Sequence, residues 1–109
     1  MTKAESIIEF ISGLHGMDRL ARENIEDRRP GAFDLLTAQS IEAHPEFPEA
    51  EYLIVEQSNG NRISFATHKL LEALLVRTAE AWALTQFGSA KSHYLQLQGH
   101  LAHKTGFSL

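Results

Sequence analysis

The sequence predicts a single α+β domain over residues 1–109, mostly helical with one antiparallel β-hairpin, in the order α-α-(α)-β-β-α-α. Three observations lead to this fold class. An Asn59-Gly60 pair separates two runs rich in β-branched and aromatic residues, which is typical of a hairpin. Apolar residues on both sides of these runs recur at helical spacing. A length of 109 residues, 43% of them apolar, suits one domain with its own core.

The first predicted helix begins at a capping box. Thr2 and Glu5 stand three residues apart, so each side chain can accept a hydrogen bond from the other's backbone N–H. The apolar residues that follow at helical spacing are Ile7, Ile8, Phe10, Ile11 and Leu14. Gly13 and Gly16 weaken a helix, so we expect a break there. The apolar stripe of a second helix then comprises Met17, Leu20, Ala21 and Ile25.

Residues 32–43 fit either a helix or a strand. The first interpretation is a helix with a thin apolar stripe, formed by Phe33, Leu36, Ser40 and Ile41. The second is a strand with one apolar side, formed by Phe33, Leu35, Thr37 and Ile41. We expect the helix. Pro45 and Pro48 then bracket an extended loop, because proline disfavours helix in the residue before it.

The hairpin strands are expected at about 51–57 and 62–66, from their β-branched and aromatic residues. Asn59-Gly60 is the preferred centre of a two-residue type I′ turn, because both positions need positive φ. Such a turn pairs Ser58 with Asn61 and places Ile54 opposite Phe65. The side chains then expected on the buried face are Tyr52, Ile54, Ile63 and Phe65. An isolated hairpin is marginal in water, so another element must cover it.

A long helix is expected from about residue 68 to residue 87, with Thr67 as its cap and Gly88 as its stop. It is apolar nearly all round, which is typical of a helix covered on several sides. We therefore expect Leu74 and Trp82 to lie in the core.

A last helix follows, which Ser89 can cap and which ends near Gly106. Its apolar stripe comprises Tyr94, Leu97 and Leu101. The same helix carries three of the six histidines, where His93, His100 and His103 share a face with Gln96.

Composition disfavours several classes of protein. The chain has no cysteine, which excludes disulfides, thiolate metal sites and cysteine nucleophiles. No apolar run approaches the ~20 residues that span a bilayer, and the N-terminus lacks a secretory pattern. We therefore expect a cytoplasmic protein that does not contact membranes. The excess of 14 acidic over 10 basic residues argues against non-specific nucleic-acid binding.

Motifs for catalysis, metals and cofactors are lacking. No acidic residue follows Glu80, so the histidines of the last helix have no carboxylate beside them to complete a zinc site. The sequence contains no Gly-x-Ser-x-Gly or His-Glu-x-x-His motif and no glycine-rich phosphate loop. We expect no metal, no cofactor and no enzymatic activity.

The middle of the chain is acidic. Between Gly31 and Asn61 there is no Lys or Arg, and the six acids of this segment are Asp34, Glu42, Glu46, Glu49, Glu51 and Glu56. Acids beside apolar residues are suited to a basic or amphipathic protein surface. We expect a small regulatory protein that acts by protein–protein interaction, for example an inhibitor (anti-activator) that sequesters a transcription regulator. The residues expected to contact the partner are Glu49, Glu51, Tyr52, Leu53, Val55 and Glu56.

Two other interpretations remain open at this point. In a winged-helix-like DNA-binding regulator, residues 32–43 would form the recognition helix and Asn59-Gly60 the tip of the wing. The lack of Lys and Arg argues against it, because both elements need cations that face phosphate. In the simplest interpretation the acids are only a solvated face.

We also expect a homodimer. The hairpin carries apolar side chains on both faces and the long helix is apolar nearly all round, which is more than a small monomer readily covers. A twofold contact through either element would cover the surplus. The alternative is a compact monomer in which the N-terminal helices cover everything.

Overall fold

The computed structural model of the chain describes residues 1–15, 40–56 and 60–109. In chain order its elements are α1 (Lys3–His15), β1 (Ser40–Ala43), β2 (Tyr52–Glu56), β3 (Arg62–Ala66), α3 (Thr67–Thr85) and α4 (Ala90–Thr105). These elements confirm the predicted α+β class, mostly helical. The second helix expected from Met17 and the Ser58-Asn59 half of the hairpin turn lie outside the described residues.

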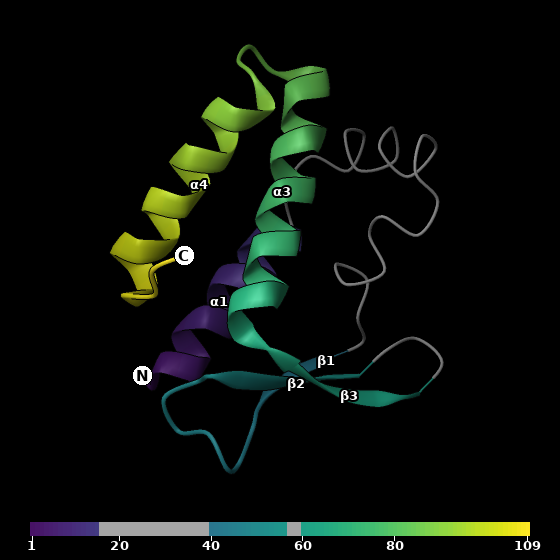
Figure 1. The fold of residues 1–109 in the computed structure, drawn as a ribbon, viewed down its shortest axis with the longest axis vertical. Coiled ribbons are helices and arrows are strands. Elements are labelled where there is room, and N and C mark those ends of the chain that lie inside the picture. The colour runs from purple at the N-terminus through teal and green to yellow at the C-terminus, as the bar shows by residue number, and fades with distance from the viewer. Residues whose placement is uncertain (16–39, 57–59) are drawn as a thin grey trace.

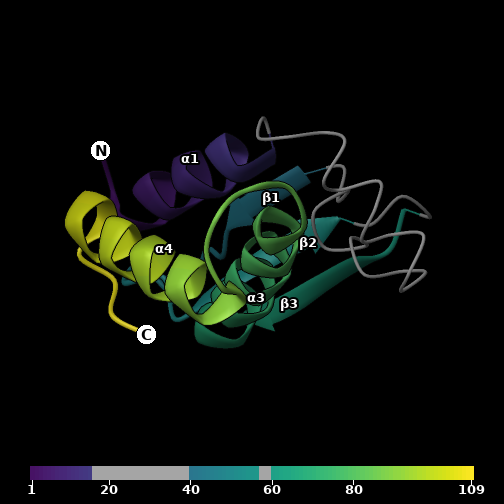
Figure 2. The ribbon, with the colours of Figure 1, turned by 90° about the horizontal axis from the view of Figure 1, so that it is seen from above.

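The described part has two layers. Its three strands form one antiparallel sheet in the order β1-β2-β3, and all three helices lie on the same side of that sheet (Figures 1 and 2). α3 rises from the end of β3, and α4 returns beside it and also packs against α1. The core lies between these helices and the covered face of the sheet.

The capping signals of α1 and α4 behave as predicted. The Glu5 N–H donates to Thr2 Oγ1 at 3.1 Å and the Thr2 N–H donates to Glu5 Oε1 at 3.4 Å, so the capping box forms. Ser89 caps α4 by accepting a hydrogen bond from the Ser92 N–H at 3.1 Å. Gly106 ends α4 with φ of 74°, a left-handed conformation that glycine adopts without strain.

The hairpin forms, but its register and the buried face of β2 differ from the prediction. Leu53 lies opposite Phe65, at the position expected for Ile54. Because side chains alternate along a strand, this one-residue shift turns the other face of β2 toward the helices. Leu53 and Val55 are fully buried, whereas Tyr52 is 39% exposed. The prediction that Tyr52 and Ile54 lie on the buried face of β2 was therefore wrong, because the opposite face is the buried one.

Two physical features explain the shift. β2 carries apolar side chains on both faces, so its pattern does not select one. The last strand pair is Glu56 with Arg62, which leaves five residues in the connection in place of a two-residue turn. On β3, Phe65 packs against the core as predicted, but Ile63 remains 38% exposed at the sheet edge.

β1 is a further correction. Ser40–Ala43 is a strand, so the helix expected over residues 32–43 does not include its last four positions; residues 32–39 lie outside the described part. Ile41 pairs with Val55 and extends the apolar face of the sheet. A recognition helix of the winged-helix kind cannot occupy 40–43.

α3 spans nearly the expected range, with three differences from the prediction. Thr67 does not cap it: the cap position is Ala66, and the Thr67 hydroxyl is buried with no hydrogen-bond partner among the described residues. Leu74 is fully buried as predicted, but Trp82 is only partly buried against the core. The helix ends at Thr85, before the expected stop at Gly88. Among the described residues, no helix has the length and apolarity needed to cross a membrane.

Candidate functional site

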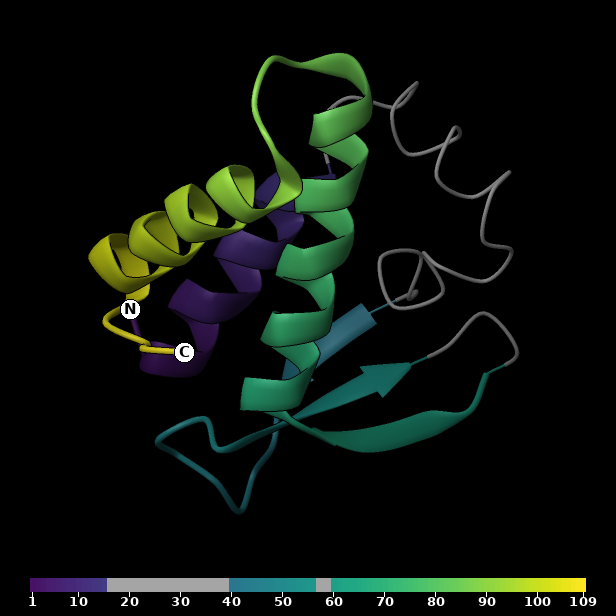
Figure 3. The ribbon, with the colours of Figure 1, turned by 45° about the horizontal axis from the view of Figure 1, so that its top comes forward.

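Half of the six predicted partner-binding residues lie on or directly beside the connection between β1 and β2, which extends from the sheet away from the helices (Figure 3). Two consecutive turns build it. The Phe47 N–H donates to the His44 carbonyl at 3.1 Å, and the Ala50 N–H donates to the Phe47 carbonyl at 3.0 Å. Pro45 and Pro48 each follow the first residue of a turn, where their fixed φ favours turning. The expected extended loop is thus a pair of tight turns.

Ala50 closes the second turn in a strained conformation. Its φ is 63°, in the left-handed region, and it is the one non-glycine residue with positive φ in the described part. This costs roughly 1–2 kcal/mol for a residue with a β-carbon. Ala50 is also fully buried, so its methyl group fills space in the core. Backbone strain of this kind persists only where the surroundings hold it, and it concentrates at functional sites.

The end of the connection is tied to the helical layer. The Thr67 N–H, at the start of α3, donates to the Glu51 carbonyl at 3.0 Å. At the other end, the Glu46 N–H donates to His44 Nδ1 at 3.2 Å. These bonds hold both ends of the connection in one arrangement.

Three aromatic rings stack along this connection. Phe47 lies between His44, at a centroid distance of 4.9 Å and edge to face, and Tyr52, at 4.7 Å. His44 and Phe47 are partly exposed, and Tyr52 is exposed. Tyr52 was among the residues expected to bind a partner, but His44 and Phe47 were not, because their spacing follows neither a helix nor a strand.

The acids beside these rings fall into two groups. Glu46, Glu49 and Glu51 are exposed, and none of them forms an ion pair with another residue in the described ranges. Glu56 differs, because Arg62 Nη1 lies 3.7 Å from its Oε2 and Ser40 Oγ donates to it at 3.4 Å.

The same guanidinium also binds Glu42, with Arg62 Nη2 2.7 Å from Glu42 Oε2. Arg62, Glu42 and Glu56 therefore form a charge cluster on the outer face of the sheet. Because the cluster includes a cation, that part of the surface is less acidic than the connection.

The structure thus divides the six predicted partner-binding residues. Glu49, Glu51 and Tyr52 come together on the connection, and Glu56 belongs to the charge cluster with Arg62. Leu53 and Val55 are fully buried in the core, so neither is part of this surface. We call the set His44, Glu46, Phe47, Glu49, Glu51 and Tyr52 the aromatic–acidic surface.

The histidines of α4 do not share one environment. His93 is buried and its ring stands edge-on against Trp82 at 5.7 Å, whereas His100 and His103 are exposed. Within the part of the chain that the structure describes, no group of three His, Cys, Asp or Glu residues is placed to hold a metal ion.

Comparison of the chain with models of protein families, with curated proteins and with solved structures finds no match.

Proposed function

We propose that this protein is a non-catalytic cytoplasmic regulator that acts by binding another protein through the aromatic–acidic surface. The observation that supports it is the contact between the Phe47 and Tyr52 rings on a strained, hydrogen-bonded connection, beside three glutamates that form no ion pair within the described residues. Large aromatic side chains at the centre of a contact, and especially tyrosine, supply most of the binding energy of protein interfaces.

The ordered connection favours binding energetically. A loop that already has its bound conformation loses little conformational entropy when the partner docks. The turns at Pro45 and Pro48 and the hydrogen bond from Thr67 supply that order. The strain at Ala50 is the stability cost of holding the rings in place.

The charges indicate the kind of partner. Glu46, Glu49 and Glu51 form no ion pair among the described residues, so they favour a surface with Lys or Arg around an apolar centre. The DNA-binding surface of a transcription regulator has this character, because it must face phosphate. A protein that covers such a surface prevents DNA binding, which is the action of an anti-activator.

A matched set of variants tests the interface in affinity purification from the native host. Glu49→Gln with Glu51→Gln removes two charges from the aromatic–acidic surface, and Glu9→Gln with Glu72→Gln removes two exposed charges elsewhere. The wild-type protein and the Glu9→Gln, Glu72→Gln variant should retain a specific partner. The Glu49→Gln, Glu51→Gln variant should bind that partner more weakly. Binding should also weaken with salt, because exposed charges are screened.

The aromatic part has its own control. Tyr52→Ala should weaken binding at least about tenfold, as expected for an interface hot spot. Ile63→Ala removes a side chain of nearly equal exposure, 38% against 39%, and should leave binding unchanged. If no partner is captured, or if Tyr52→Ala and the Glu49 and Glu51 pair bind as wild type does, the proposed interface is wrong.

The inhibitory action is tested separately. When the captured partner binds DNA, an equimolar amount of this protein should displace the DNA in a fluorescence anisotropy titration. A partner that keeps its DNA in the presence of the bound protein would refute the anti-activator role while leaving the interface intact.

We also propose that the protein is a homodimer. Its support is apolar surface near the α3–α4 connection, where Phe87 is fully exposed and Leu95 more than half exposed. Light scattering at micromolar concentration should give twice 12.2 kDa. Phe87→Asp should return the particle to the monomer mass, whereas the control Ser92→Asp should not. A wild-type mass of 12.2 kDa would contradict the dimer.

A further inference from the structure

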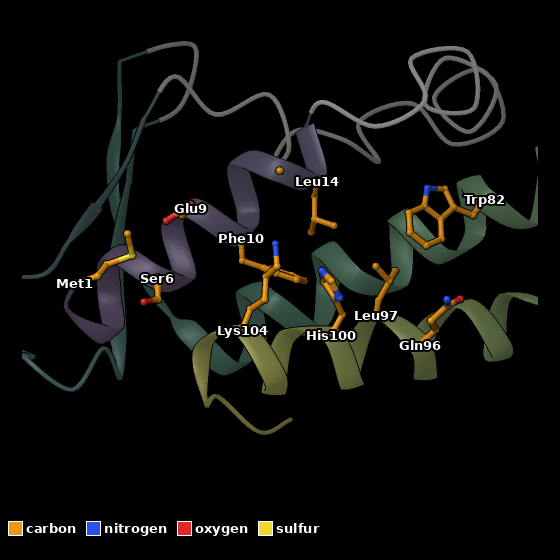
Figure 4. A pocket seen from close by; sticks show the side chains of 11 residues that line it. Met1, Ser6, Glu9, Phe10, Leu14, Trp82, Gln96, Leu97, His100 and Lys104 are labelled. Atoms are coloured by element: carbon orange, nitrogen blue, oxygen red, sulfur yellow. The ribbon is translucent and has the colours of Figure 1, made fainter.

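A cavity of about 540 Å³ lies between α1 and α4, with Trp82 of α3 at one end (Figure 4). It shares no residue with the aromatic–acidic surface. Its volume is in the range of pockets that take small organic molecules, roughly 300–1,000 Å³. The opening lies between two helices that also pack against each other.

One end of the cavity is apolar and aromatic. Phe10, Leu14 and Leu97 are buried residues that line it. Trp82 also lines it and is only partly buried, and Figure 4 shows its indole ring at the end beyond Leu14 and Leu97. Flat rings on its walls favour a planar aromatic body by stacking or edge contacts.

The middle of the cavity carries the Lys104 ammonium beside the imidazole ring of His100 (Figure 4). His100 and Lys104 both line it, and they lie four residues apart on α4, so their side chains share one face of the helix. The His100 ring also lies 5.9 Å from the Phe10 ring. The chain has no Asp or Glu after Glu80, so α4 brings two basic side chains to the cavity without an acid of its own.

One acid does line the cavity from the opposite helix. Glu9 of α1 lies with Met1 and Ser6 at the end away from Trp82 (Figure 4). It forms no ion pair with Lys104 in the described part. The Lys104 ammonium is therefore left available to a ligand.

We propose that this cavity binds a small planar aromatic carboxylate. The ring system lies among Trp82, Leu14 and Leu97, and the carboxylate accepts hydrogen bonds from Lys104 and His100. An ionised acceptor on a lysine donor makes a stronger hydrogen bond than a neutral acceptor does. The charge of the ligand therefore supplies selectivity, and its ring supplies buried apolar area.

The test uses 2-naphthoate as the probe and 2-naphthamide as its neutral analogue. The chain has a single tryptophan, so the indole N–H resonance of Trp82, which lines the cavity, is assigned without ambiguity in a ¹⁵N-labelled sample. We expect 2-naphthoate to shift that resonance, and calorimetry to show that it binds at least about fivefold more tightly than the amide.

Lys104→Met should weaken the binding of 2-naphthoate by about the same fivefold factor and leave the affinity for 2-naphthamide unchanged. Lys91→Met is the matched control, because Lys91 is an exposed lysine of α4 outside the cavity, and it should bind as wild type does. Circular dichroism checks that both variants fold. An unmoved indole resonance, equal affinity for acid and amide, or equal effects of the two lysine variants would each overturn the proposal.

Discussion

Replacing Gly88 with alanine should destabilise the protein more than the same replacement at Gly106. Gly88 has φ of 119°, and a β-carbon there would lie 3.1 Å from His93 Nε2 and 3.3 Å from His93 Cε1. The His93 ring cannot easily move aside, because it is buried and stands edge-on against Trp82. Alanine therefore meets both backbone strain and a steric clash.

The magnitudes follow from these two contributions. The backbone conformation costs a non-glycine residue about 1–3 kcal/mol. Overpacking against a buried ring adds about 1–3 kcal/mol, so we expect a total loss of roughly 2–6 kcal/mol in the free energy of unfolding. At Gly106, φ is also positive at 74°, but no atom lies within 4 Å of the added β-carbon. Gly106→Ala should therefore cost only about 1 kcal/mol.

Gly99 supplies the opposite control. It lies inside α4 with no atom within 4 Å of an added β-carbon and no positive φ. Gly99→Ala should stabilise the protein by roughly 0.5–1 kcal/mol, because alanine favours the helix. Urea unfolding of the three variants, followed by circular dichroism, should give this order of stability.

A double-mutant cycle separates the clash from the strain. In a His93→Ala background the ring is gone, so Gly88→Ala should lower the free energy of unfolding only by the backbone contribution. Equal destabilisation by Gly88→Ala and Gly106→Ala, or an unchanged cost of Gly88→Ala without the ring, would refute this reasoning.

Three other predictions concern the core, acid stability and metals. Leu74→Ala should lower the free energy of unfolding in urea by about 2–5 kcal/mol, because Leu74 is fully buried. Trp82→Ala should cost less than the ~3–5 kcal/mol of a core aromatic, because Trp82 is partly exposed. An unchanged urea midpoint for Leu74→Ala would contradict the burial of Leu74. Hydrogen bonds from Thr2, its hydroxyl first and its backbone N–H second, lower the pKa of Glu5 below the ordinary 4.5. Its contribution to stability is therefore complete above pH 4.5 and is lost as the pH falls through the lowered pKa. Thermal unfolding across this acid range should show that Thr2→Val loses less stability with falling pH than the wild-type protein does. The same pH dependence of stability in both proteins would count against the capping box. Elemental analysis of untagged protein should find no stoichiometric zinc, and a one-to-one content would show that the histidines of α4 bind metal after all.

Features that depend on a few neighbouring residues were predictable from the sequence. The Thr2 and Glu5 capping box, the Ser89 cap and the Gly106 stop each need only backbone groups within one turn of the helix. The burial of Leu74 follows from the position of a strongly apolar helix between other elements.

The candidate sites were only partly predictable. Charge alone pointed to Glu49 and Glu51, because an excess of acids is visible in the sequence without any fold. The ring stack of His44, Phe47 and Tyr52 was not visible, since it requires two successive turns to bring the rings together. The cavity draws its walls from α1, α3 and α4, and α1 is far along the chain from the other two helices, so no local pattern indicates it.

The face of β2 depended on tertiary contacts. Tyr52 and Ile54 on one face and Leu53 and Val55 on the other are similarly apolar, so burial of either face was compatible with the sequence. Pairing with β1 and cover by the helices selected Leu53 and Val55. Local sequence was enough for the hairpin, the helices and the ends at Thr2, Ser89 and Gly106, because these depend on short-range spacing and capping. It was not enough for the strand type of β1 or for the two ends of α3. Register, buried face and cavity were decided only by tertiary structure, because they depend on which apolar surfaces meet across long stretches of chain.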